Sequence, residues 1–91
     1  MLESARSTTT WVGLEVGGVS YALNIQHVRE IIRPLPMQVL PHASQTVIGV
    51  IDHRGDVVPI VDLRVRFGTP TRTDLAHTRW VIANLHGKLF G

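Results

Sequence analysis

Apolar residues in this 91-residue chain recur at every second position in several short runs, and glycine-containing turns separate the runs. Such alternation places the apolar side chains on one face of a β-strand. The first two runs occupy residues 11–16 and 19–25, and Gly17 and Gly18 lie between them. Because glycine readily adopts positive φ angles, this arrangement predicts a β-hairpin with a two-residue turn.

The same pattern returns in the middle of the chain. Residues 47–51 form a compact apolar run, which predicts a buried strand. The stretch from His53 to Asp56 has the composition of a hairpin turn, and residues 57–61 supply the return strand. Pro59 cannot donate a backbone hydrogen bond, so we expect the return strand to lie at a sheet edge or to be bulged there.

One segment between these hairpins shows a helical pattern instead. From Ile25 onwards, apolar residues recur at steps of three and four residues until Pro34 and Pro36 end the pattern. This spacing favours one face of a helix, and proline cannot continue a helix interior. We therefore predict a short helix over about Gln26 to Ile32.

The last third of the chain contains one more helical signal and two more strands. Asp62 is placed to cap a single helical turn over residues 63–68, which ends at a glycine. Residues 79–85 alternate again, and residues 86–91 contain a turn and the beginning of a further strand.

Several short strands, tight turns and one short helix predict an all-β fold, and a small barrel or sandwich is the usual way to protect the edges of such strands. We predict a folded domain over residues 11–91, preceded by a polar, flexible leader over residues 1–10. The composition, with 44% hydrophobic and 18% charged residues, is that of a globular chain.

Catalytic, cofactor-binding and metal-ligating residues are not predicted. The chain has no cysteine, and its five histidines lack the close spacing that places two imidazoles on one metal ion. No serine lies in a nucleophile elbow. Asp52, Asp56 and Asp62 could be imagined as paired carboxylates, but a turn residue, a loop acceptor and a helix cap explain them more simply.

Charge and aromatic content bear on the kind of partner. The net charge is +2, and all but one of the nine basic residues are arginine, which suits forked contacts with carboxylates at protein interfaces. A nucleic-acid-binding surface needs a basic stripe with interleaved aromatics, whereas the chain has only two Trp, one Tyr and two Phe, none clustered with arginine. A basic nucleic-acid-binding β-barrel therefore stays the less favoured alternative.

Three segments resemble the CheW-like family of bacterial chemotaxis coupling proteins. Residues 19–32 are similar to the opening strand and V-x-E-I segment of that family, and residues 78–91 to a later strand pair. The longest match, residues 49–63, reads G-V-I-D-H-R-G-D-V-V-P-I-V-D-L and resembles the signature G-V-I-N-L-R-G-x-V-V-P-V-V-D-L. The resemblance implies SH3-like β-barrel subdomains, with the second barrel incomplete over this length.

The resemblance also implies a function and a set of contact residues. The implied function is that of a non-catalytic, cytoplasmic adaptor that couples the cytoplasmic tips of chemoreceptors to the regulatory domain of a histidine kinase. The candidate protein-interface residues are Arg54, Glu30, Val28, Gly55 and His53.

Each of these residues also has a structural interpretation. Arg54 matches the turn arginine of the family, and a long guanidinium has little structural purpose at an exposed turn. Gly55 serves the turn itself, and Glu30 is either an interface acid or a solvated helix acid. Val28, with Ile31 and Ile32, is expected in the core and is also a candidate for partner contact.

One departure from the family pattern lies beside Arg54. Asp52-His53 stands where the family usually has Asn-Leu, so an ionisable pair adjoins the arginine and partner contact could be sensitive to pH. Two further alternatives concern the whole chain. It could be part of a CheW-like regulatory domain of a larger kinase or of a receiver-fused coupling protein, and its open final strand could pair with a second copy as a homodimer or by strand exchange.

Overall fold

Strands make up nearly all of the regular structure. The computed structural model describes residues 9–41, 46–69, 74 and 76–91. Its elements are β1 (Trp11–Val16), β2 (Val19–Asn24), a 3-10 turn η1 (Ile25–His27), β3 (Val28–Ile32), β4 (Val47–His53), β5 (Asp56–Val61), α2 (Leu63–Phe67), β6 (Trp80–Leu85) and β7 (Lys88–Phe90). The predicted leader over residues 1–10 lies mostly outside the described residues.

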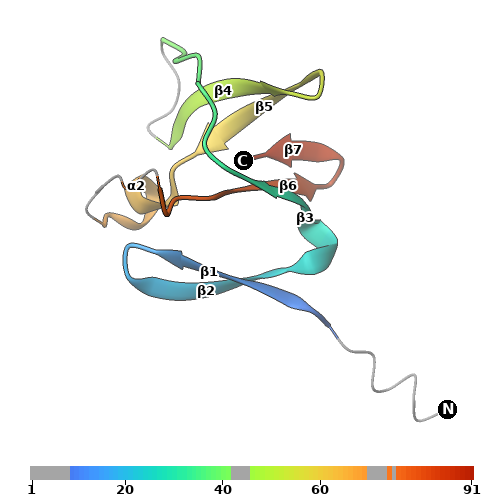
Figure 1. The fold of residues 1–91 in the computed structure, drawn as a ribbon, viewed down its shortest axis with the longest axis vertical. Coiled ribbons are helices and arrows are strands. Elements are labelled where there is room, and N and C mark those ends of the chain that lie inside the picture. The colour runs from blue at the N-terminus through green and yellow to red at the C-terminus, as the bar shows by residue number, and fades with distance from the viewer. Residues whose placement is uncertain (1–8, 42–45, 70–73, 75) are drawn as a thin grey trace, which may run out of the picture.

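Seven strands form three antiparallel sheets in the described part of the chain. Strands β1 and β2 pair as a hairpin, β4 and β5 form a second hairpin, and β3, β6 and β7 form a sheet in the order β3-β6-β7. In Figure 1, β4 and β5 lie above β6 and the β1–β2 hairpin lies below it. The three-stranded sheet is thus the middle layer of the molecule.

The predicted hairpin turns are confirmed. Arg54 and Gly55 have φ angles of 54° and 85°, so both central residues of the β4–β5 turn are left-handed. This is the turn type whose twist matches that of the flanking strands, and a residue with a side chain adopts it at some cost. Arg54 is therefore held at the tip of the hairpin by the backbone geometry of the turn.

The core lies between the β4–β5 hairpin and the middle sheet. Its buried cluster is Ile51, Val58, Ile60 and Ile82, and Trp80 and Leu89 are among the half-buried residues packed against it. Gly91 extends the contact, because its N–H donates to the carbonyl of Pro59 at 2.8 Å and its carbonyl accepts from the N–H of Val61 at 2.7 Å.

The position of Pro59 follows the prediction. Strand β5 has β4 as its one partner strand in its sheet, so it is an edge strand there, and a register shift in this pair lies between Val47 and Gly49. The carbonyl of Pro59 accepts from Gly91, on the side of β5 that faces away from β4. The backbone nitrogen of Pro59 points to the same side, so its missing N–H leaves no gap in the β4–β5 ladder.

The predicted helix over Gln26 to Ile32 is wrong. Only Ile25–His27 of this segment is helical, as one 3-10 turn in which the Asn24 side chain accepts a hydrogen bond from the Gln26 N–H, and Val28–Ile32 is strand β3. The β-branched residues of this segment favour an extended backbone, and β6 supplies hydrogen-bonding partners along its length. Val28, Glu30 and Ile32 are half-buried, whereas Ile31 is 51% exposed, so the expectation that Ile31 belongs to the core is also wrong.

The predicted helical turn after Asp62 is confirmed as α2. The Asp62 carboxylate accepts hydrogen bonds from the backbone N–H of Arg64 at 2.9 Å and from the guanidinium of the same residue at 3.0 and 2.9 Å. Gly68, with a φ angle of 68°, ends the helix in the left-handed conformation.

Removing this cap is expected to destabilise the chain. Asp62→Ala should lower the free energy of unfolding by about 1 kcal/mol near neutral pH, because the first N–H groups of α2 lose their acceptor. The hydrogen bond from the Arg64 side chain, opposed by burial, holds the pKa of Asp62 below its ordinary value. The stabilisation is therefore present above the unfolded pKa of about 3.9 and is lost as pH falls through the lower folded value. Urea unfolding of both proteins from about pH 7 to about pH 3 checks this, and a difference that stays constant down to the lowest pH contradicts it.

Candidate functional site

Three of the predicted interface residues meet at one corner of the molecule. Glu30 lies on β3, His53 is the last residue of β4, and Arg54 is the first residue of the following turn. The Glu30 Oε2 atom is 2.7 Å from the His53 Nε2 atom, and the Arg54 guanidinium donates to Glu30 Oε1 at 2.9 Å. These contacts link the middle sheet to the β4–β5 hairpin, and we call the three residues the Glu30 cluster.

Local structure holds the donors of this cluster in place. The Asp52 carboxylate accepts a hydrogen bond from the Gly55 N–H at 3.1 Å, which closes the turn that carries Arg54. His53 is paired with Asp56 in the β4–β5 ladder, so its backbone is fixed by the strand register. On the other side, the β3–β6 register shifts between Val28 and Glu30.

Exposure differs sharply within the Glu30 cluster. The side chain of His53 is 13% exposed, that of Glu30 is 31% exposed and that of Arg54 is 72% exposed. The hydrogen bond from His53 lowers the pKa of Glu30; burial opposes this change and the charge of Arg54 adds to it. Glu30 is therefore ionised throughout the neutral range, and it presents Arg54 at the surface as part of an ion pair.

The remaining predicted residues have different positions. Gly55 lies in the same turn with a φ angle of 85°, and a Cβ atom there would meet no atom within 4 Å. The turn conformation thus explains this glycine. Val28 is half-buried two positions before Glu30 on β3. The structure thus brings Glu30, His53 and Arg54 into direct contact, and it places Gly55 and Val28 next to them along the chain.

A second ion pair lies near this corner. The Arg29 guanidinium is 3.9 Å from the Asp56 carboxylate, and both side chains are about half exposed. The sequence holds no local signal for this pair, because Arg29 and Asp56 belong to segments far apart in the chain.

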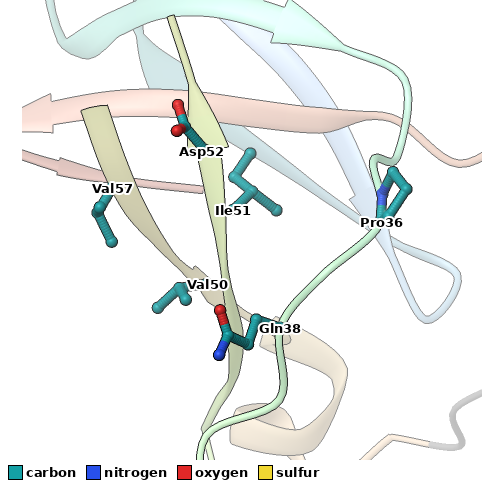
Figure 2. Close-up of a pocket in the computed structure, with 6 residues that line it drawn as sticks. All are labelled: Pro36, Gln38, Val50, Ile51, Asp52 and Val57. Carbon is teal, nitrogen blue, oxygen red and sulfur yellow. The ribbon is translucent and has the colours of Figure 1, made fainter. Parts of the chain in front are cut away.

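A hollow on the β4–β5 hairpin was also not predicted (Figure 2). It has a volume of about 400 Å³, and Val57 on its rim is 71% exposed. The segment before β4 forms its other side, because Gln38 and Val50 exchange two backbone hydrogen bonds of 2.9 Å. The lining residues are Pro36, Gln38, Val50, Ile51, Asp52 and Val57. The strand predicted over residues 47–51 carries no signal for the isolated bridge between Gln38 and Val50.

A larger cleft opens between the β1–β2 hairpin and the middle sheet. It has a volume of about 1010 Å³, and we call it the apolar cleft. Its apolar lining includes Val12, Leu14, Leu23, Ile31, Trp80, Leu85 and Phe90. Strands β1 and β2 pair only with each other among the described strands, so this cleft presents apolar surface beside open strand edges.

A metal-binding group and a membrane-spanning helix are both absent from the part of the chain that the structure describes. No three His, Asp or Glu side chains there are grouped closely enough to hold a metal ion. Within the same residues, no helix has the length and hydropathy to cross a membrane.

Known proteins with similar sequences identify the family. The model of the CheW-like domain matches residues 10–91, which is nearly the whole chain. The chain belongs to the CheW-like domain family. The resemblance seen in residues 19–32, 49–63 and 78–91 is thereby confirmed.

Individual relatives extend this result. The chain is 27% identical over 89 residues to the Chemotaxis protein CheW of Helicobacter pylori, with 98% of this chain and 54% of the relative covered. It is 34% identical over 80 residues to the Chemotaxis protein CheW of Rhizobium meliloti, with 88% and 52% covered. The chain therefore spans about half the length of these CheW proteins.

A solved structure gives the same answer for the fold. The scaffolding protein TtCheW from Thermoanaerobacter tengcongensis superimposes with a TM-score of 0.84 at 26% identity, over 91% of this chain and 57% of that one. The predicted fold class, an all-β fold of the SH3-like barrel type, is confirmed by this similarity. The one short α-helix of the described residues is α2, not the helix predicted over Gln26 to Ile32.

Proposed function

We propose that this chain is a non-catalytic adaptor that couples chemoreceptors to a chemotaxis histidine kinase through protein–protein contacts. The observation that carries the proposal is the CheW-like match over residues 10–91, together with relatives named as chemotaxis proteins and a neighbour named as a scaffolding protein. The proposed partners are the regulatory domain of the kinase and the cytoplasmic tip of a receptor. This function requires a cytoplasmic location.

We further propose the Glu30 cluster, with Val28 and Gly55, as part of the contact surface. Arg54 supports this assignment, because its guanidinium has five N–H groups and one of them is occupied by Glu30. The outer groups face solvent on a side chain that is 72% exposed. Such a group can make forked contacts with a carboxylate on a partner.

Binding measurements with each partner test the proposed function. Titration of the chain with a purified kinase regulatory domain, and separately with a receptor-tip fragment, should give saturable binding in calorimetry. Binding to neither protein, combined with binding to random-sequence DNA that weakens steeply with salt, would instead support the nucleic-acid alternative.

We also propose that the chain self-associates through the apolar cleft. The support is the apolar lining, the exposure of Ile31 and the open edges of β1 and β2. A second copy can cover the apolar surface and pair with a strand edge at the same time.

Charge placed in the cleft should therefore disrupt the dimer. Ile31→Lys is expected to convert a dimer to a monomer in sedimentation velocity, since a lysine ammonium would have to be desolvated in the contact. Val39→Lys is the matched control, because Val39 is exposed and does not line the cleft. A wild-type chain that stays monomeric at high concentration contradicts self-association.

A further inference from the structure

His53 is the inner of two donors that hold one carboxylate. Each oxygen of Glu30 has its own partner, with the His53 imidazole on Oε2 at 2.7 Å and the Arg54 guanidinium on Oε1 at 2.9 Å. His53 is the most sheltered of the three side chains and Arg54 the most exposed. The orientation of the carboxylate therefore depends on one sheltered contact and one solvated contact.

These two contacts differ in strength for a physical reason. An ion pair made by a long, exposed side chain is weakened by solvent screening and by the entropy lost when the side chain is fixed. The imidazole of His53 has only two side-chain torsions and lies at the end of a paired strand, so less motion is lost in its contact. His53 thus contributes more than Arg54 to the orientation of Glu30.

We propose that His53 is a positioning residue: its protonation offsets the charge of Glu30, so that the carboxylate holds Arg54 less strongly and the Arg54 guanidinium becomes free for a carboxylate on the partner. The inference rests on the proposed function, because it concerns the same contact surface. The group that Arg54 contacts on the partner is an acidic side chain, and proton uptake by the His53 imidazole regulates that contact.

The charges around His53 favour stronger binding of an acidic partner when His53 is protonated. Asp52 precedes it on β4, Asp56 lies opposite it in the β4–β5 ladder, and Arg29 pairs with Asp56. Glu30 faces it from β3 and Arg54 follows it in the turn. A proton on His53 raises the net charge of this group by one, which strengthens attraction for an acidic partner.

Imidazole is the side chain whose charge ordinarily changes between about pH 5 and 8. Glu30 stays ionised across that range, because His53 and Arg54 lower its pKa. Binding of an acidic partner should therefore strengthen as pH falls through this window.

The test compares three proteins with one matched control. The affinity of the wild-type chain for a receptor-tip fragment should increase by about threefold or more between about pH 7.5 and 5.5. His53→Gln keeps a donor without a charge, so its affinity should stay within about twofold of wild type at the higher pH and should not change with pH. His53→Leu should bind about fivefold more weakly and also without pH dependence.

His77→Gln is the control, because His77 is an exposed histidine paired with Asp74. It should keep the wild-type pH profile. Thermal unfolding shows whether each variant is folded, and His53→Gln keeps the test decisive if His53→Leu unfolds. A wild-type pH profile in folded His53→Gln or His53→Leu overturns the proposal.

A measurement on the free chain separates this proposal from the proposed function. The NMR signal of the Arg54 side-chain N–H should shift with pH in the wild-type chain and remain constant in His53→Gln. If no partner binds at any pH, the proposed function fails, and this signal alone decides the positioning role: a shift that depends on His53 supports it and a constant signal overturns it.

Discussion

Ile82→Ala is expected to lower the free energy of unfolding by about 2–5 kcal/mol, the range for large-to-small changes at buried sites. Ile82 is 0% exposed and lies on β6, the central strand of the middle sheet. Its side chain belongs to the cluster that joins this sheet to the β4–β5 hairpin. Alanine would leave a cavity at the point where the two sheets meet, in a domain whose total stability is only about 5–15 kcal/mol.

Urea unfolding measures this loss directly. Val57→Ala is the control, because Val57 lies on β5 beside the same core but is 71% exposed, and it should change the free energy of unfolding by less than about 0.5 kcal/mol. Equal effects of the two substitutions would contradict the position of the core between the middle sheet and the hairpin.

Arg54→Glu is expected to weaken binding to the receptor-tip fragment by about tenfold or more, equivalent to about 1.4 kcal/mol. The substitution removes the exposed guanidinium and places a second carboxylate next to Glu30, so the contact surface changes sign. Like charges brought together at an interface also oppose association. The fold should be retained, because the side chain of Arg54 is 72% exposed.

Two further variants isolate the role of this position. Arg66→Glu makes the same charge change on an exposed residue of α2 and should leave binding within about twofold of wild type. The double variant Glu30→Arg with Arg54→Glu restores an ion pair but reverses its orientation, and it should still bind weakly. Full recovery in the double variant would show that the pair acts only in the stability of the chain.

Much of the fold can be predicted from turn chemistry. Gly17-Gly18, Arg54-Gly55 and His86-Gly87 each occupy two-residue turns with positive φ angles, as the alternation on either side of them predicts. Asp62 and Gly68 mark the two ends of α2 in the same way. These features are local, because a few neighbouring residues determine the backbone conformation.

The segment from Val28 to Ile32 shows where local reasoning fails. Its apolar residues fit steps of three and four as well as an alternating pattern, and five residues are too few to separate the two periods. The decisive interaction is pairing with β6. In this pairing Ile32 lies opposite Trp80, which is more than 45 positions further along the chain. A contact at that separation leaves no trace in local periodicity.

The residues of the Glu30 cluster can be selected from the sequence, but the contacts between them cannot. The motif resemblance selects Glu30 and Arg54, whereas the short contact between His53 and Glu30 joins side chains 23 positions apart. Glu30 is half-buried because Val28–Ile32 is a strand and not a helix. Its contact with His53 then depends on how the sheets pack against each other, which the sequence does not reveal.

Joint recovery of both partners is the most direct test of the adaptor function. A tagged kinase regulatory domain is mixed with the receptor-tip fragment, with and without this chain, and the captured material is examined for the receptor fragment. The proposed function predicts that the fragment is captured when the wild-type chain is added, and much less when Arg54→Glu is added. Equal capture of the fragment with and without the chain would contradict the proposed coupling function.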